Sequence, residues 1–355
     1  MNGIINVLKP AGMTSFDVVS HLRKVAGQKK IGHTGTLDPS AVGVLPICLG
    51  SATRAIEFII DKDKVYRAEL TLGSATDTQD SSGKVIFSGK IEADTDKIAD
   101  AIMSFVGEID QLPPMYSAIK IEGKKLYELA RQGETVERQP RKIKIYDIKI
   151  LRIWETVERL PGNNADSHCQ PEVPVKKALF EVHCSKGTYI RTLCHDIGEK
   201  LGCGGHMSFL IRTRAGRYDL ESALTLEEIK KLAADKELES SLISVETVFE
   251  DFKSIHLNEK DTFKYNNGVW LKINYNEAID VPRLVETLLG YENFSAAEKS
   301  SKDVNRSFEP MSYKNDGTNP YIRVYDNNDI FLGIGEIFDN GQGTCLKSKK
   351  FFIKD

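Results

Sequence analysis

The most informative stretch of the chain reads GHTGTLDPSAVGVLP and spans residues 32–46. Glycine and proline are too dense there for a long regular element, so we predict a structured loop over residues 31–50. Pro39 biases Asp38 towards an extended backbone, and the nearby glycines let a ligand approach the main chain closely. Such a loop can present a lone carboxylate. A plain Asp-Pro turn is the simpler interpretation, and for these two residues alone it is favoured.

Regular elements are predicted on both sides of this loop. Thr14 is placed to cap a helix that carries an apolar stripe. Residues 65–72 alternate in polarity as a strand does, with Tyr66 on the apolar face. The polar residues 73–83 predict a loop, and residues 94–106 have the apolar spacing of a helix.

The second half of the chain alternates predicted strands and helices. Residues 141–153 predict a strand with an irregularity near Tyr146. Residues 155–176 show no periodicity and contain the turn-like sequence PGNN, so we predict an exposed insertion. A strand over residues 178–184 then leads into a turn and a helix whose stripe includes Leu193.

The composition changes near residue 246. From there the sequence has short apolar runs separated by glycine and asparagine turns, which predicts a small β-rich domain over residues 246–355. Residues 1–245 are predicted to form the larger domain. The fold class expected from the whole pattern is α+β.

Four further side chains are candidates for a site with Asp38. Arg191 falls in the first turn of its predicted helix, where a cation opposes the helix dipole, so an anionic partner such as Asp38 is a reasonable inference. An ordinary surface arginine is the simpler alternative. Tyr66 and Tyr189 can line a pocket and stack on a base, although a core tyrosine is the simpler interpretation of Tyr66. His33 either bonds within the loop or contacts a nucleic acid, and the first is favoured for a lone histidine.

The remaining composition narrows the class of protein. Six cysteines are scattered without a Cys-x-x-Cys pair, and the Cys–His neighbours lack the spacing of a structural zinc site. The chain contains no run of about 18 apolar residues, so no membrane span is predicted. The N-terminus lacks the features of a signal peptide, so a cytoplasmic protein is expected. No nucleotide-binding loop or Ser-His-Asp motif is visible, which fits a reaction without a cofactor.

Charge is distributed unevenly along the chain. Residues 1–119 carry 12 Lys/Arg and 14 Asp/Glu, residues 120–217 carry 19 and 12, and residues 218–355 carry 17 and 25. The net charges are therefore −2, +7 and −8, which add up to the −3 of the whole chain. A basic middle segment permits a local phosphate-binding face on an acidic protein. A solvated lysine-rich surface would have the same composition.

Taken in order, several segments resemble the TruB family of pseudouridine synthases. These are residues 7–15 (VLKPAGMTS), 32–46, 64–66 (KVY), 76–80 (TDTQD), 113–120 (PPMYSAIK) and 185–191 (SKGTYIR). The resemblance covers residues 3 to about 217. It implies a catalytic domain built around a mixed, largely antiparallel sheet, followed by a small PUA-like RNA-binding module that the acidic C-terminal part resembles only loosely.

The resemblance also implies an activity and a site. The substrate would be tRNA, the reaction conversion of the T-loop uridine at position 55 to pseudouridine, and no metal or cofactor would be needed. Asp38 matches the catalytic aspartate, Tyr66 the active-site tyrosine and Arg191 the arginine that pairs with the aspartate.

Four more residues match positions that bind the substrate. Lys9, Tyr189 and Leu210 match pocket residues, and His33 matches the histidine that contacts the T-loop. The protein is expected to act as a monomer without an obligate partner or a membrane. A non-catalytic tRNA-binding or tRNA-folding chaperone, and a zinc hydrolase using the Cys–His pairs, are the competing hypotheses.

Overall fold

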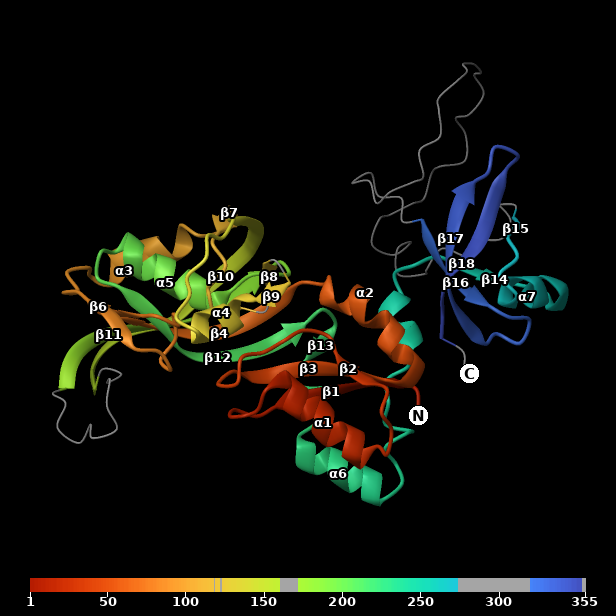
Figure 1. Cartoon of the computed structure of the whole chain (residues 1–355), viewed down its shortest axis with the longest axis horizontal. Coiled ribbons are helices and arrows are strands. Elements are labelled where there is room, and N and C mark those ends of the chain that lie inside the picture. Colours follow the sequence, from red (N-terminus) through yellow and green to blue (C-terminus); the bar gives the residue numbers. More distant parts are fainter. Residues whose placement is uncertain (118, 122, 160–171, 274–319, 353–355) are drawn as a thin grey trace, which may run out of the picture.

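The computed structural model describes residues 1–117, 119–121, 123–159, 172–273 and 320–352. An elongated part with mixed helices and strands is followed by a smaller β-rich part at one end of the molecule (Figure 1). The N-terminus lies near the junction of the two parts. No helix of the described residues is long and apolar enough to cross a membrane.

A nine-stranded sheet forms the frame of the larger part. Its neighbouring strands are antiparallel except for the pairing of β12 with β3. The predicted largely antiparallel sheet is therefore confirmed. In spatial order the strands are β1 (Gly3–Lys9), β3 (Val42–Leu49), β12 (Gly205–Ala215), β4 (Lys64–Leu72), β11 (Glu172–Cys184), β10 (Arg141–Arg159) and β7 (Gly107–Gln111), with β2 (Ile31–His33) beside β3 and β13 (Tyr218–Asp219) beside β12.

Most of the helices of this part pack on the sheet, and short elements connect its strands. The helices are α1 (Ser15–Val25), α2 (Ile56–Ile60), α3 (Thr95–Met103), α4 (Leu126–Arg131), α5 (Ile190–Lys200) and α6 (Leu226–Ala234), with 3₁₀ turns η1 (Gly50–Ala55) and η3 (Val245–Phe249). The short strands outside the sheet are β5 (Ser74–Thr76), β6 (Val85–Ser88), β8 (Lys120–Ile121) and β9 (Lys124–Lys125).

Two apolar clusters join helices to the sheet. In one, Ile102 of α3 and Leu193 of α5 share a buried cluster with Phe180 of β11. In the other, α1 and α6 lie against β1 and β3. The predicted cap of α1 is confirmed, because the Thr14 hydroxyl accepts from the Asp17 amide at 3.0 Å and the Asp17 carboxylate accepts from the Thr14 amide at 2.8 Å. Such reciprocal bonds satisfy donors that a helix N-terminus leaves open.

The prediction of a loop over residues 31–50 was wrong outside residues 34–41, because residues 31–33 form strand β2 as well. Residues 42–49 form strand β3, which pairs with β1 along its length. Pro46 is tolerated because it falls between the part of β3 that pairs with β12 and the part that pairs with β2, so neither ladder needs its missing N–H. Only residues 34–41 form the loop that carries Asp38.

The predicted insertion over residues 155–176 was also wrong at both ends. Strand β10 continues to Arg159 and β11 starts at Glu172, and the two pair in an extended hairpin. Residues 160–171 lie outside the described residues. Among residues 172–176 only Val175 is buried, so this end of the hairpin shows little apolar periodicity in its sequence. An ion pair between Glu155 and Lys176 links its two strands. The irregularity near Tyr146 is confirmed by a register shift in β10.

The C-terminal part is rich in strands, as predicted. Its five-stranded sheet runs β14 (Ser254–His256), β16 (Tyr321–Tyr325), β17 (Phe331–Asp339), β18 (Thr344–Phe351) and β15 (Leu271–Lys272), with helix α7 (Glu259–Asn266) beside it. A shared cluster that includes Ile4, Phe249 and Phe352 joins the two parts. Ser51 and Arg54 of η1 also donate to backbone carbonyls at the end of the C-terminal sheet.

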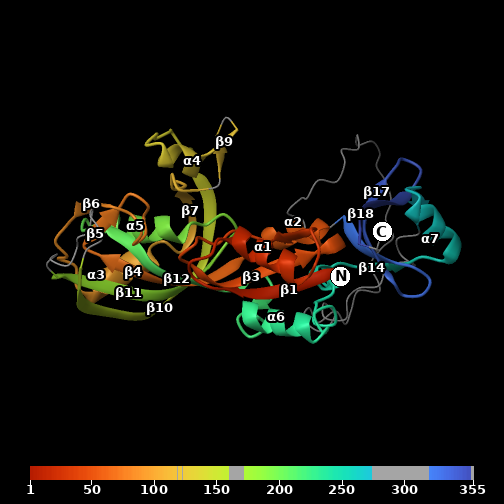
Figure 2. The same cartoon turned by 60° about the horizontal axis from the view of Figure 1, so that its bottom comes forward.

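One segment stands away from the body of the protein. The chain leaves the sheet at the end of β7, forms β8, β9 and α4, and returns as β10. Figure 2 shows this segment rising from the sheet as an arm. Its first residues lie beside the loop that carries Asp38, as the contacts of the site show.

Candidate active site

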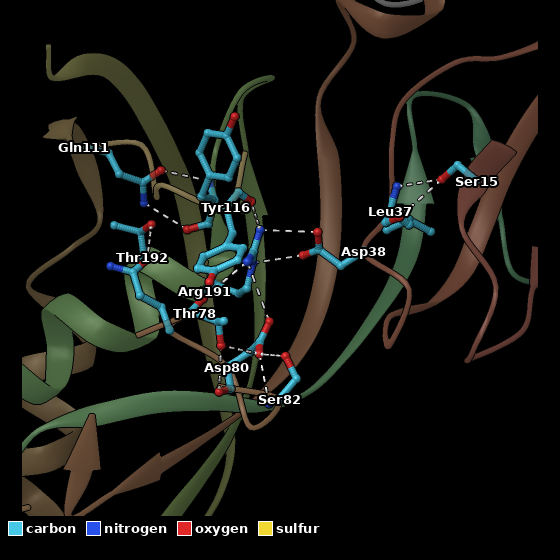
Figure 3. A network of polar contacts seen from close by, with 12 residues as sticks. Ser15, Leu37, Asp38, Thr78, Asp80, Ser82, Gln111, Tyr116, Arg191 and Thr192 are labelled. Atoms are coloured by element: carbon cyan, nitrogen blue, oxygen red, sulfur yellow. Dashed lines mark hydrogen bonds and ion pairs between the residues drawn. The ribbon is translucent and has the colours of Figure 1, made fainter. Parts of the chain in front are cut away.

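Ser15 and Lys9 hold the loop over residues 34–41 in place. The Ser15 hydroxyl of α1 accepts from the Leu37 amide at 2.9 Å and donates to the Leu37 carbonyl at 3.3 Å (Figure 3). The Ala41 amide donates to the Asp38 carbonyl at 3.1 Å, which closes the turn after the aspartate. The backbone on both sides of Asp38 is thereby fixed, and its side chain projects from a rigid turn.

Lys9 is the second anchor. Its ammonium is fully buried and donates to the carbonyls of Ala41 at 2.7 Å, Pro10 at 2.8 Å and Pro39 at 3.3 Å. Burial lowers the pKa of Lys9 to about 8, with Asp38 acting in the opposite direction. In the protein alone these bonds tie the loop to β1. Contact between Lys9 and a substrate stays a prediction.

Asp38 and Arg191 meet as expected from the sequence. Arg191 Nε lies 2.9 Å from Asp38 Oδ2, and its Nη2 donates to Oδ1 at 3.3 Å. Figure 3 shows the guanidinium and the carboxylate facing each other across the site. The arginine side chain is 7% exposed and the aspartate side chain 33%, so the pair is open to solvent on the side of the aspartate. A two-point pair of this kind fixes orientation as well as charge.

The same guanidinium makes three further contacts. Its Nη2 donates to the carbonyl of Tyr116 at 2.9 Å, and its Nη1 donates to the carbonyl of Thr78 at 3.3 Å. Asp80 lies 3.6 Å from Nη1 and is itself held by the hydroxyl of Thr78 at 2.8 Å. Arg191 therefore connects the Asp38 loop, the segment after β5 and the base of the arm.

Gln111 fixes the start of the helix that carries Arg191. Its amide donates to the Tyr189 carbonyl at 3.0 Å and accepts from the Tyr189 N–H at 2.8 Å. Tyr189 is the N-cap of α5 and has no side-chain cap of its own. Gln111 is the last residue of β7, and it thus links the root of the arm to this cap.

Tyr66 and Leu210 are buried beside the loop that carries Asp38. Both belong to the buried cluster that includes Leu37, and the exposed fraction of Tyr66 is 9%. Burial raises the pKa of Tyr66, while the charge of Arg212 lowers it. The negative charge of Asp38 also raises the pKa of Tyr66, so the carboxylate lies close enough to the phenol to affect its ionisation.

His33 is set apart from this group. It ends β2, is half-buried, and its Nδ1 accepts from the Gly35 amide at 3.3 Å. Burial lowers the pKa of His33, and Arg212 adds to that effect. The structure thus brings Asp38, Arg191 and Tyr66 together and leaves His33 at the rim of the loop.

The electrostatics of Asp38 combine opposing effects. Burial raises the pKa of the carboxyl group, Arg191 opposes that rise, Asp80 adds to it and Lys9 opposes it. Burial is the largest of these causes, so the pKa lies above the ordinary range for aspartate. No group of three or more His, Cys, Asp or Glu side chains among the described residues is arranged to hold a metal ion.

Comparison with known proteins identifies the family. The model of the TruB family pseudouridylate synthase N-terminal domain matches residues 23–190, and that of the tRNA pseudouridylate synthase B C-terminal domain matches residues 191–250. A protein named tRNA pseudouridine synthase B from Clostridioides difficile is 41% identical over 99% of this chain and 100% of its own length. The chain belongs to the TruB family. The synthase B of Caldanaerobacter subterraneus is 39% identical over 99% of both chains, and that of Alkaliphilus oremlandii is 53% identical over 65% of this chain and 71% of its own.

Solved structures support the fold of this TruB family member. The chain in a structure titled as an H/ACA RNP bound to a substrate RNA containing 2′-deoxyuridine matches with a TM-score of 0.62 at 22% identity, covering 99% of this chain and 85% of that chain. A Cbf5-Nop10-Gar1 complex gives a TM-score of 0.62 at 23% identity, with the same coverage. At these identities the likeness shows that the fold is shared.

Sequence reasoning missed several residues that build the site. Asp80 and Tyr116 lie in segments that match the family, but nothing in their local pattern marked them as contacts of Arg191. Gln111 ends an ordinary strand, and a side-chain amide that bonds to the backbone of a distant residue, Tyr189, has no local sequence signal. Arg212 was missed because a basic residue in an alternating strand is usually exposed.

Proposed function

We propose that Asp38 is the catalytic carboxylate of a tRNA pseudouridine synthase that acts on the T-loop uridine at position 55. The activity itself, isomerisation of a tRNA uridine, follows from full-length relatives that are named tRNA pseudouridine synthase B. The observation that supports the site is the ion pair of Asp38 with Arg191 at the end of a rigid loop.

The reaction rearranges bonds within one nucleotide. The bond from C1′ to N1 breaks, the uracil turns, and a bond from C1′ to C5 forms. C5 then loses its proton and N1 gains one, so the product is an isomer and no other reactant is consumed. The target base has to leave its stack first, which costs less in an RNA loop than in a duplex.

Asp38 has two possible roles in this scheme. The carboxylate can act as a nucleophile on the nucleotide, or it can assist removal of the C2′ proton. Either role needs an ionised and correctly oriented carboxylate, and Arg191 supplies both conditions through its two contacts. The proposal covers both pathways.

The other proposed site residues surround the flipped base. Tyr66 stacks on the uracil and takes part in proton transfer, and Tyr189 and Leu210 line the pocket. Lys9 supports the loop from below, and His33 contacts the T-loop where the base leaves the stack. Relatives and site geometry give no support to the alternative of a non-catalytic chaperone.

The wider setting of the protein is part of the proposal. We assign residues 1–245 to the catalytic domain and residues 246–355 to a small domain with its own five-stranded sheet. The protein is proposed to act on tRNA in the cytoplasm, as a monomer, without a cofactor. One of the structures that share its fold is a Cbf5-Nop10-Gar1 complex, and Nop10 and Gar1 are partners of that protein.

The decisive test of substrate and position is a map of pseudouridine in tRNA from cells that lack this protein. Loss of pseudouridine at position 55, with other positions unchanged, is the expected result. Re-expression of the intact chain should restore it, and the Asp38→Asn variant should not. An unchanged position 55 in the deletion strain would reject the proposed substrate site.

A further inference from the structure

A buried arginine occupies the middle of β12 beside the candidate site. The side chain of Arg212 is 2% exposed and is among the largest fully buried side chains of the described residues. In the sheet it stands opposite Tyr66 of β4 on one side and Gly43 of β3 on the other. Burying a guanidinium is unfavourable unless its charge is compensated. Its partners therefore show what the position requires.

The protein compensates this charge only with neutral groups. Arg212 Nε donates to the Val44 carbonyl at 2.7 Å, and its Nη2 donates to the Gly35 carbonyl at 3.4 Å. None of the ion pairs formed within the described part of the chain involves Arg212, whereas Arg214 on the same strand pairs with Asp63. A buried cation held by carbonyl dipoles alone is suited to stabilising an anion that forms nearby.

Arg212 and Tyr66 are directly opposite each other on neighbouring strands, so their side chains lie on the same face of the sheet. The charge of Arg212 lowers the pKa of the Tyr66 phenol, against the effect of burial. The other titratable groups that act on Tyr66 are the thiol of Cys184 on β11 and the carboxylate of Asp38 on the loop. Burial keeps the Cys184 thiol neutral by raising its pKa to about 12. The charge of Asp38 opposes a negative charge on the phenol, and the charge of Arg212 favours it.

A neighbouring lysine does not take this place. Lys64 is buried near Arg212, but its ammonium donates to the carbonyls of Ile60 and Lys62 and so closes the turn before β4. Its pKa is lowered to about 8, first by burial and then by Arg212. Arg212 is therefore the buried cation that stands directly opposite Tyr66 in the sheet.

We infer that Arg212 is a positioning residue that holds the Tyr66 oxygen ready to accept the proton from C5 of the turned uracil. The inference rests on the proposed function, in which Tyr66 takes part in proton transfer. Tyr66 first gives its own phenolic proton to solvent, and the charge of Arg212 stabilises the phenolate that remains. Once the C1′–C5 bond has formed, this phenolate takes the C5 proton and the electron pair of the C5–H bond returns to the ring. N1 gains its proton from solvent and the phenol is restored, so atoms and charge balance.

The test measures proton release from C5 with the full chain and a tRNA transcript. Transcript carrying tritium at C5 of uridine gives the single-turnover rate as a function of pH, and transcript with deuterium there gives an isotope effect. Arg212→Met removes the charge and keeps the length of the side chain. Arg214→Met is the matched control, because Arg214 lies on the same strand and contacts Asp63 instead.

Arg212→Met is expected to slow single turnover by roughly ten- to a hundredfold, less than the roughly hundredfold to ten-thousandfold that a positioned proton-transfer group contributes, because Tyr66 itself stays in place. Because Arg212 lowers the pKa of Tyr66, its loss raises that pKa and moves the rising limb of the pH profile to higher pH. The isotope effect at C5 should grow, and the Kd for tRNA should stay the same. Arg212→Lys should recover part of the rate.

Several results would overturn the inference. One is a folded Arg212→Met enzyme with the parent rate, pH profile and isotope effect. Another is weaker tRNA binding by Arg212→Met with a smaller salt dependence, which would indicate that Arg212 contacts a phosphate. Should Arg212→Met fail to fold, Arg212→Lys decides, because it keeps a charge but shortens the reach to Tyr66. If Arg212→Lys has the same single-turnover rate and pH dependence as the parent enzyme, the inference is also rejected.

Tyr66→Phe separates this inference from the proposed function. If Tyr66→Phe keeps the parent rate, the proposed role of Tyr66 fails. If Tyr66→Phe is slow and the Arg212 variants are unaffected, the inference about Arg212 fails alone. Because Arg212 acts through Tyr66, the double variant should be no slower than Tyr66→Phe. Additive losses would contradict the inference.

Discussion

Replacing Gln111 with leucine should weaken both the fold and the reaction. Leucine has a similar volume but removes the bonds at 3.0 Å and 2.8 Å to the backbone of Tyr189. The Tyr189 carbonyl still accepts from the Leu193 amide at 3.1 Å, so one backbone N–H loses its partner. A buried donor without a partner costs about 1–3 kcal/mol, so we expect the free energy of unfolding to fall by about 2 kcal/mol.

The effect on catalysis follows from the same contact. Tyr189 caps the helix that begins at Ile190 and carries Arg191 in its first turn. A shift of this cap displaces the guanidinium that orients Asp38. Misplacement of a catalytic group by about 1 Å can cost as much as a hundredfold in rate, so we expect single turnover to slow by roughly tenfold or more.

The chain offers a direct readout of this change. Its two tryptophans are Trp154 on β10 and Trp270 in the C-terminal part. In a Trp270→Phe background, the fluorescence of Trp154 reports urea unfolding of the large sheet. Gln111→Glu is the matched control, because its carboxylate still accepts from the Tyr189 amide and should retain most of the stability. An equal urea midpoint and an equal rate for Gln111→Leu would refute the reasoning.

Three further predictions concern the support of Asp38 and the first helix. Burial raises the pKa of Asp38, so activity should be lost as pH falls through values above the usual aspartate pKa of about 3.9. Because Arg191 opposes that rise, Arg191→Met should move this acid limb of the single-turnover pH profile to still higher pH. An acid limb that does not move in Arg191→Met would contradict this prediction. Ser15→Ala leaves the Leu37 amide without its partner and should lower the free energy of unfolding by about 1–3 kcal/mol and also slow single turnover, and an unchanged rate would show that the loop needs no such anchor. Thr14→Ala removes the cap of α1 and should cost about 1 kcal/mol in urea unfolding with the rate unchanged, so a large loss of rate would argue against a purely structural cap.

Local patterns in the sequence predicted the features that depend on neighbouring residues. Thr14 was expected to cap a helix, and it forms a reciprocal capping box with Asp17. Placing Arg191 in the first turn of a helix led to the expectation of an acidic partner, and Asp38 lies 2.9 Å from it. These inferences succeeded because helix ends impose local chemistry that a short window of sequence records.

Features that depend on distant partners could not be predicted in this way. Arg212 and Arg214 are two positions apart on β12, so simple alternation places them on the same face. A register shift between them changes their surroundings, and Arg212 is 2% exposed while the side chain of Arg214 is 42% exposed. Pro46 misled the prediction of β3 for a related reason, since only the pairing of neighbouring strands shows that its missing N–H is not needed.

The central claim is that the carboxylate of Asp38 performs the chemistry. The most direct measurement is single-turnover formation of pseudouridine at position 55 of a tRNA transcript by the Asp38→Asn variant, together with its Kd for that tRNA. The asparagine keeps the size of the side chain and can no longer ionise, so turnover should disappear while tRNA binding stays largely intact. Turnover by this variant near the parent rate would contradict the assignment.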